Sequence, residues 1–151
     1  MLRRKVRAHG WLTLACLICG ISSAFAAINE PTPLGPEGGT IYKVAFHPTN
    51  GSIAYAGTAA GFYRSADGGL TWTLTPGVPR DHVYDSAADP NNGDRVFIPL
   101  INHFTVQVTS DAGLSSSRLS TFPIVQWGPS SIEISGDGTL YVVGQDRLFR
   151  S

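Results

Sequence analysis

The chain has 151 residues, and its 11 lysines and arginines balance its 11 aspartates and glutamates. Four of the basic residues lie within the first seven positions, so residues 27–151 carry seven basic and eleven acidic side chains, a net charge of −4. This balance argues against a surface that binds nucleic acid or anionic membranes, and the length suits one domain.

The first predicted element is a secretory signal peptide over residues 1–26. A basic start is followed by an apolar run over residues 11–19 and by a small-x-small cleavage site that ends at Ala26. We therefore expect a secreted or periplasmic protein with a linker over residues 27–34.

Two alternatives to a cleaved signal peptide stay open. One is a membrane-spanning helix, which requires roughly 20 apolar residues, more than this run offers. The other is a lipoprotein modified at Cys16 or Cys19, although neither residue follows a convincing Leu-small-small sequence. Both cysteines lie in the leader, so the mature chain would contain no disulfide.

Short β-rich runs separated by Gly, Pro, Asn and Asp follow from residue 40 onward, without a sustained helical period. This pattern predicts an all-β protein with three sets of strands. The predicted strands are 40–47, 53–58, 61–65 and 71–75 in the first set, 82–88, 95–100, 104–110 and 116–121 in the second, and 130–135, 140–144 and 147–151 in the third.

The three sets repeat with a period of about 43 residues. The turn sequence at 48–51 lies forty-two residues before the one at 90–93, and Tyr55 lies eighty-six residues before Tyr141. Four short strands in about 40 to 45 residues are typical of a β-propeller blade. We therefore predict an incomplete β-propeller of about two and a half four-stranded antiparallel blades. The predicted blades cover residues 35–79, 80–123 and 124–151.

The stretch RSADGGLTW at 64–72 contains a known motif. Its defining residues, which combine a hydroxyl, a carboxylate, a glycine and an aromatic ring, are Ser65, Asp67, Gly69, Thr71 and Trp72. They match every defining position of the Asp box, or BNR repeat. The chain thus resembles the sialidase-like, sortilin-like and xyloglucan-active propellers and the photosystem II assembly factors that carry this box.

A second, degenerate box follows at the same phase of the repeat. Thr109, Asp111 and Gly113 keep the hydroxyl, the carboxylate and the glycine, whereas Ser116 replaces the tryptophan. A third box would begin at Ser151. The resemblance implies that the chain is the N-terminal fragment of a longer propeller.

The residue types of the box predict a turn-building role. Asp67 can accept hydrogen bonds from N–H groups of its own turn, and Ser65 offers a hydroxyl across the turn. Gly69 permits a positive φ, and Trp72 can bury its ring against a neighbouring strand. We therefore expect this cluster to serve folding and not catalysis.

An acidic run between residues 81 and 94 contains the candidate ligand surface. The repeat places Asp89 and Asp94 in an inter-strand turn, and the spacing does not fit a calcium loop. Asp81, His82 and Asp85 lie near the start of the predicted innermost strand of the second blade, on the side that lines the channel of a propeller. We predict that these three residues contribute to a ligand-binding surface.

No catalytic or cofactor motif is found. The histidines lack metal-ligand spacing, so we expect no metal and no cofactor. The resemblance to sialidases fails at Phe97-Ile98-Pro99, which lacks the preceding arginine, and the resemblance to xyloglucan-active hydrolases fails at Ala59, where a catalytic Asp would stand. The sequence favours a non-catalytic scaffold that binds a protein or a glycan, and the alternative is part of a glycoside hydrolase whose catalytic residues lie outside this chain.

An unclosed stack of blades should expose its two flanking sheets. We therefore expect self-association, or packing against the remainder of a longer propeller. The aromatic residues expected to lack neighbours are Phe62, Tyr63, Trp72, Phe97 and Phe149.

Overall fold

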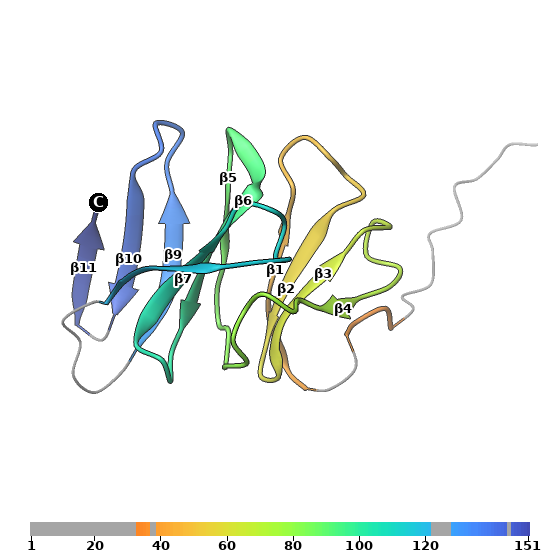
Figure 1. Cartoon of the computed structure of the whole chain (residues 1–151), viewed down its shortest axis with the longest axis horizontal. Helices are drawn as coiled ribbons and strands as arrows, with labels where there is room; N and C mark the ends of the chain where they lie inside the picture. The colour runs from red at the N-terminus through yellow and green to blue at the C-terminus, as the bar shows by residue number, and fades with distance from the viewer. Residues whose placement is uncertain (1–32, 37–38, 122–127, 145) are drawn as a thin grey trace, which may run out of the picture. The chain divides into compact units, whose positions relative to one another are not determined.

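The computed structural model describes residues 33–36, 39–121, 128–144 and 146–151 (Figure 1). The predicted signal peptide and most of the predicted linker lie outside these residues. The described part of the chain consists of β-strands and connecting turns, without helices. It therefore contains no helix that is long and apolar enough to cross a membrane.

Within the described residues, eleven strands form three antiparallel sheets, in which strands adjacent in sequence are also adjacent in space. The first sheet comprises β1 (Ile41–Phe46), β2 (Ala54–Thr58), β3 (Gly61–Ser65) and β4 (Thr73–Leu74). The second comprises β5 (Ala87–Asp89), β6 (Asn92–Leu100), β7 (Thr105–Thr109) and β8 (Ser117–Thr121). The third comprises β9 (Pro129–Ile134), β10 (Leu140–Gly144) and β11 (Arg147–Arg150).

The meander order and the antiparallel pairing agree with the predicted all-β fold of an incomplete, unclosed propeller. The strand predicted at 61–65 has the observed bounds. A turn joins β5 to β6 as predicted, but it comprises only residues 90 and 91, so Asp89 ends β5 and Asp94 lies within β6. The strand predicted at 82–88 is wrong at its start, because β5 begins at Ala87. Val83, ahead of β5, donates its N–H to the carbonyl of Thr58 in the first sheet (3.0 Å) and thus pairs outside its own sheet.

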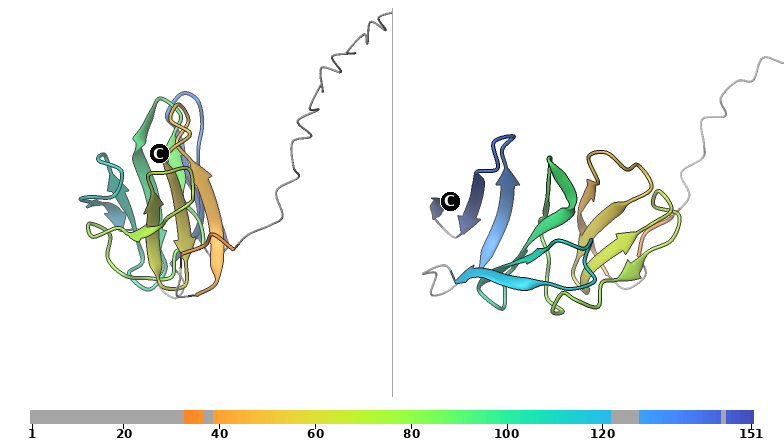
Figure 2. Two further views of the ribbon diagram at one scale, coloured as in Figure 1. Left: turned by 90° about the vertical axis from the view of Figure 1, so that its right-hand side faces the viewer. Right: turned by 45° about the horizontal axis from the view of Figure 1, so that its top comes forward.

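The three sheets follow one another in chain order in Figure 2, and two apolar clusters join them. The first brings together Tyr55 and Phe62 of the first sheet with Val96 and Ile98 of the second, and the rings of Tyr55 and Phe62 stack at 5.7 Å. The second joins the second and third sheets, and its buried members are Ala87, Phe97, Val106, Ile132, Leu140 and Val142. Burial of these side chains is the main force that holds sheet against sheet.

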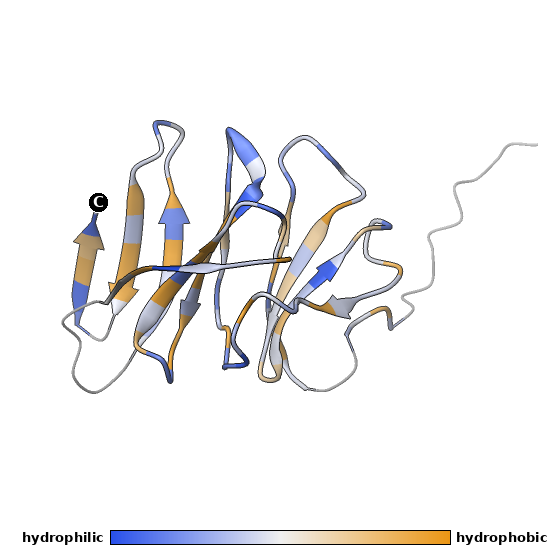
Figure 3. Ribbon diagram, viewed as in Figure 1, coloured by the Kyte–Doolittle hydropathy of each residue, from blue (hydrophilic) through white to orange (hydrophobic). Residues whose placement is uncertain are grey.

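The expected exposure of Phe62 and Phe97 is wrong. Their side chains are 1% and 3% exposed, because each points from its sheet toward the next sheet in the chain. β9 ends in an alternation of apolar and polar residues, and it carries both orange and blue bands in Figure 3. The exposed apolar side chains of the flanking sheets instead belong to β1, β10 and β11.

Two glycines allow the first and second sheets to approach closely. A Cβ atom on Gly57 would lie 2.5 Å from the carbonyl oxygen of Val83, and one on Gly93 would lie 2.5 Å from ring atoms of His47. A side chain at position 57 would therefore require the backbone at Val83 to move, and one at position 93 would require the His47 ring to move. The spacing between these sheets therefore depends on glycine at both positions.

Candidate functional site

The turn between β3 and β4 is closed by Ser65, Asp67 and Thr71. The Asp67 carboxylate accepts hydrogen bonds from the Thr71 N–H (2.9 Å), the Thr71 hydroxyl (2.6 Å) and the Ser65 hydroxyl (2.7 Å). Ser65 Oγ also accepts a bond from the N–H of Gly69 (2.8 Å), whose φ of 95° is a conformation that glycine favours. The side-chain oxygens of Ser65, Asp67 and Thr71 thus all form hydrogen bonds within the turn.

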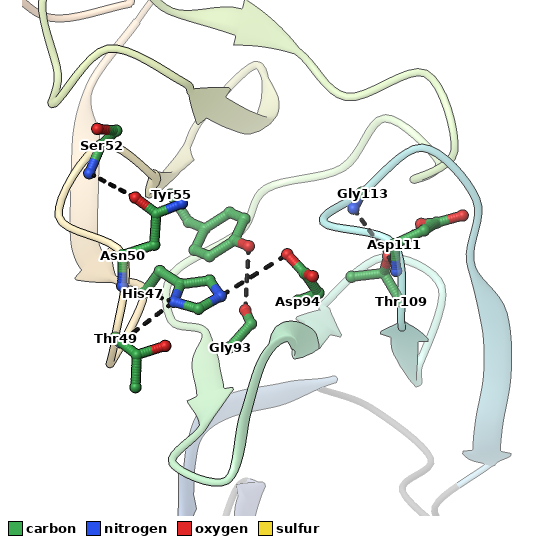
Figure 4. Close-up of polar contacts among 10 residues, drawn as sticks. All are labelled: His47, Thr49, Asn50, Ser52, Tyr55, Gly93, Asp94, Thr109, Asp111 and Gly113. Atoms are coloured by element: carbon green, nitrogen blue, oxygen red, sulfur yellow. Dashed lines mark hydrogen bonds and ion pairs between the residues drawn. The ribbon is translucent and has the colours of Figure 1, made fainter.

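The turn between β7 and β8 repeats this network atom by atom. Asp111 accepts bonds from the Ser115 N–H (2.9 Å), the Ser115 hydroxyl (2.5 Å) and the Thr109 hydroxyl (2.7 Å). Thr109 accepts a bond from the N–H of Gly113 (2.8 Å), as Figure 4 shows, and Gly113 also has a φ of 95°. The degenerate sequence therefore builds the same turn.

The two turns differ at the position of the tryptophan. The Trp72 indole N–H donates to the carbonyl of Gly69 in its own turn (3.0 Å). The corresponding Ser116 donates to the carbonyl of Gly77, which lies in the connection between the first and second sheets. The loss of the tryptophan thus exchanges a local contact for a link between sheets.

These hydrogen bonds stabilise the charged form of both turn carboxylates. The hydroxyl and N–H of Thr71, followed by the hydroxyl of Ser65, lower the pKa of Asp67 to about 2. Ser115 and Thr109 lower the pKa of Asp111 to about 2 in the same way. Both carboxylates are ionised at neutral pH and already engaged, which fits a folding role.

The segment 81–85 alternates buried and exposed residues, and Asp81 anchors its first end. The Asp81 carboxylate is fully buried and accepts bonds from the Asn102 side chain (2.5 Å) and from the N–H of His103 (3.1 Å). It also lies 2.8 Å from His103 Nδ1 and accepts a bond from the N–H of His82 (2.7 Å). Asp81 therefore fastens this segment to the turn between β6 and β7.

Asp85 anchors the other end and links all three sheets. Its carboxylate accepts bonds from the Ser131 hydroxyl (2.7 Å) and the Ile132 N–H (3.0 Å) in β9. It also pairs with the Lys43 ammonium in β1 (3.1 Å) and accepts a bond from the Ser86 N–H (2.9 Å). Burial alone would raise the pKa of Asp85, but the bonds from Ser131, Ile132 and Lys43 outweigh burial, so this pKa is lowered.

The exposed residues of the same segment, His82 and Tyr84, form an aromatic cluster with Tyr42. The Tyr42 and Tyr84 ring centroids are 4.4 Å apart, and the His82 ring meets the Tyr84 ring edge-on at 6.2 Å. Tyr42 and Tyr84 are each 39% exposed, and His82 is also exposed. We call these three side chains the aromatic surface.

The structure thus separates the three predicted ligand residues. His82 faces solvent, whereas the carboxylates of Asp81 and Asp85 are occupied by protein groups. Sequence reasoning missed Tyr42 and Tyr84, although they lie forty-two residues apart, at the repeat spacing of the turns. The prediction of a ligand surface at these positions stays a prediction.

Polar contacts between the first and second sheets involve the start of β6, which contains Gly93 and Asp94 (Figure 4). The Tyr55 hydroxyl donates to the carbonyl of Gly93 (3.1 Å), and His47 Nε2 lies 3.7 Å from an Asp94 oxygen. Burial, followed by the charge of Asp94, raises the pKa of Tyr55 to about 12. In the part of the chain that the structure describes, no cluster of acidic, His or Cys side chains could hold a metal ion.

The fold is similar to that of solved β-propellers. The GH74 xyloglucanase from Xanthomonas campestris matches with 20% identity and a TM-score of 0.61, over 71% of this chain and 20% of its own. The GH74 enzyme from Niastella koreensis matches with 24% identity and a TM-score of 0.60, over 71% and 19%. YCF48 bound to a D1 peptide matches with 22% identity and a TM-score of 0.56, over 75% and 38%.

These similarities show that the chain has a β-propeller fold. The chain spans less than two fifths of the length of each of these structures. No protein-family model and no curated protein matches the sequence.

Proposed function

We propose that this chain is a secreted or periplasmic, non-catalytic Asp-box propeller module that binds a protein or a glycan. The observation that carries the proposal is the geometry of segment 81–85. Its buried carboxylates hold the backbone at both ends, and the residues between them present His82 and Tyr84 beside Tyr42. A rigid, exposed aromatic surface offers a large contact area at a small cost in side-chain entropy.

The neighbouring structures support both classes of ligand. One is named as a xyloglucanase, an enzyme that acts on a glycan, and another contains a bound peptide. Aromatic rings with polar edges suit both ligands, because they stack on the apolar faces of sugars and also contact extended peptides. The proposal does not require a free carboxylate, and Asp81 and Asp85 offer none.

A binding assay tests this proposal. The probes are soluble xyloglucan and an array of peptides, and the variants of the full chain are Tyr84→Ala and His82→Ala. We expect binding to one probe, which weakens about tenfold in the variants, equal to 1.4 kcal/mol. Leu70→Ala, at an exposed position in the β3–β4 turn, is the matched control and should bind as the wild type does. Equal affinity of Tyr84→Ala and the wild type would refute the role of the aromatic surface.

The identical hydrogen-bond networks of the two hairpin turns support the assignment of both as Asp boxes. The signal peptide is part of the same proposal, and mass spectrometry of the mature N-terminus tests it directly. We expect a chain that begins after Ala26 in the extracytoplasmic fraction. An intact Met1 on cytoplasmic material would contradict the proposed localisation.

A second candidate function is part of a propeller glycoside hydrolase. The similarity to two GH74 enzymes favours it, and in that case the catalytic carboxylates would lie outside residues 1–151. Reading the coding sequence beyond Ser151 distinguishes the candidates. Further boxes with inward-facing carboxylates would favour the hydrolase.

A further inference from the structure

Each flanking sheet carries an exposed apolar face. On β1, Val44 and Phe46 are 43% and 64% exposed, and they alternate with residues that point toward the second sheet. On the third sheet, Val143 of β10 pairs with Leu148 of β11, and these side chains are 40% and 65% exposed. We call these the outer face of the first sheet and the outer face of the third sheet.

The strand registers show which positions correspond in the three sheets. Ala54 pairs with Ser65 in the first sheet, Val96 pairs with Thr109 in the second, and Leu140 bonds to Ser151 beyond the end of β11. From each of these pairs we count three residues forward on the first strand and three residues back on the second strand. This count leads to the pairs Gly57–Phe62, Pro99–Val106 and Val143–Leu148.

Phe62, Val106 and Leu148 are thus equivalent, and their exposed fractions are 1%, 0% and 65%. Phe62 is buried against the second sheet and Val106 against the third. Leu148 presents the same kind of face without a sheet beyond it in the described part of the chain. The outer face of the third sheet is therefore built to receive another sheet.

The outer face of the first sheet can be compared with a covered face of the third sheet in the same way. Val44 pairs with Ala56 and Ile132 pairs with Val142 at equivalent places in the first and third sheets. Ile132 is 1% exposed because the second sheet covers it, whereas Val44 is 43% exposed. The outer face of the first sheet is thus the kind of face that packs on a preceding sheet.

A polar contact can accompany this packing. Tyr141 occupies the place of Tyr55, whose hydroxyl donates to Gly93 of the next sheet. Gly51 occupies the place of Gly93, and the space beside its Cα is open. The two outer faces therefore match both in apolar side chains and in this donor and acceptor.

We propose that the outer face of the third sheet of one copy packs on the outer face of the first sheet of a second copy. Two such head-to-tail interfaces would join the three described sheets of each copy into a ring of six, within the range of about four to eight blades of closed propellers. This pairing covers both apolar faces at once. It does not depend on the proposed ligand binding.

Light scattering coupled to gel filtration of the full chain tests the proposal. We expect a two-copy mass for the wild type, and a one-copy mass for Phe46→Glu and for Leu148→Glu, because each places a charge in the interface. Leu114→Glu, at a position 68% exposed in the β7–β8 turn, is the control and should keep the two-copy mass. Mixing the two face variants should restore a two-copy species, since one interface between them stays intact.

Circular dichroism checks that each variant is folded, and Val44→Glu and Val143→Glu provide a second pair if one of the first unfolds. A one-copy mass of the wild type at every concentration would overturn the proposal. So would a Leu148→Glu variant that keeps the two-copy mass, because the outer face of the third sheet would then take no part.

Discussion

The carboxylates of the hairpin turns and those of segment 81–85 use similar hydrogen bonds for different purposes. Asp67 and Asp111 accept all their bonds from residues within four positions along the chain. Asp81 and Asp85 accept bonds from residues more than twenty and more than forty positions away. The first pair shapes a turn, and the second pair holds distant parts of the fold together, so their removal should have different consequences.

Acid should produce the largest effect, because it removes both kinds of contact at once. Hydrogen bonds, led by those from Thr71 and Ser115, lower the pKa values of Asp67 and Asp111 to about 2, and the pKa of Asp85 is also lowered. In the unfolded chain these carboxyls titrate near about 3.9, so the unfolded state binds more protons between roughly pH 4 and 2. Stability should be complete above about pH 5 and fall steadily below about pH 4.

Thermal melts between pH 7 and pH 2 measure this loss. Asp67→Asn removes one of the titrating groups, and its melting temperature should depend less steeply on pH than that of the wild type. A wild-type melting temperature that stays constant down to pH 2 would contradict the lowered pKa values.

Replacement of Asp85 should be the most harmful single change of a carboxylate. Asp85→Ala leaves the Ile132 N–H and the Ser131 hydroxyl without their acceptor and removes the partner of Lys43. The free energy of unfolding should fall by about 2 to 3 kcal/mol, the usual cost of buried polar groups that lose a partner. Urea unfolding measures it. Asp146→Ala, at an exposed position, is the control and should unfold as the wild type does.

Asp67→Ala and Asp111→Ala should have smaller effects that resemble each other. The two networks share the same bonds, so each variant should lower the melting temperature by several degrees and less than Asp85→Ala does. Differential scanning calorimetry of the three variants provides the ranking. If Asp67→Ala proved the most harmful, the turns and not the links between sheets would dominate stability.

The same distinction explains what the sequence could predict. The β3–β4 turn was predictable because the spacing of Ser65, Asp67 and Gly69 determines contacts within one short turn. The strand at 61–65 was predictable for a similar reason, since β-rich residues lie between clear turn signals. Local pattern and repeat spacing together were enough for the fold class.

The contacts of Asp81 and Asp85 could not be predicted in this way. Nothing near Asp85 in the sequence indicates Ser131 or Lys43, which reach it only when three sheets assemble. The direction of Phe62 and Phe97 was missed because the sequence does not show which face of a blade meets its neighbour. A comparison of equivalent positions across the repeats would have found the pairing of Tyr42 with Tyr84.

The glycines at the junction of the first two sheets restrict how this sequence can vary. Where a side chain fills an interface, a lost methyl group can be compensated by a larger neighbour. Gly57 and Gly93 are required because they lack a Cβ atom. The Val83 carbonyl and the His47 ring occupy the space that this atom would take. Compensation would require a shift of the backbone at Gly57 and a displacement of the His47 ring at Gly93, so these two positions restrict divergence even though they contribute no side chain.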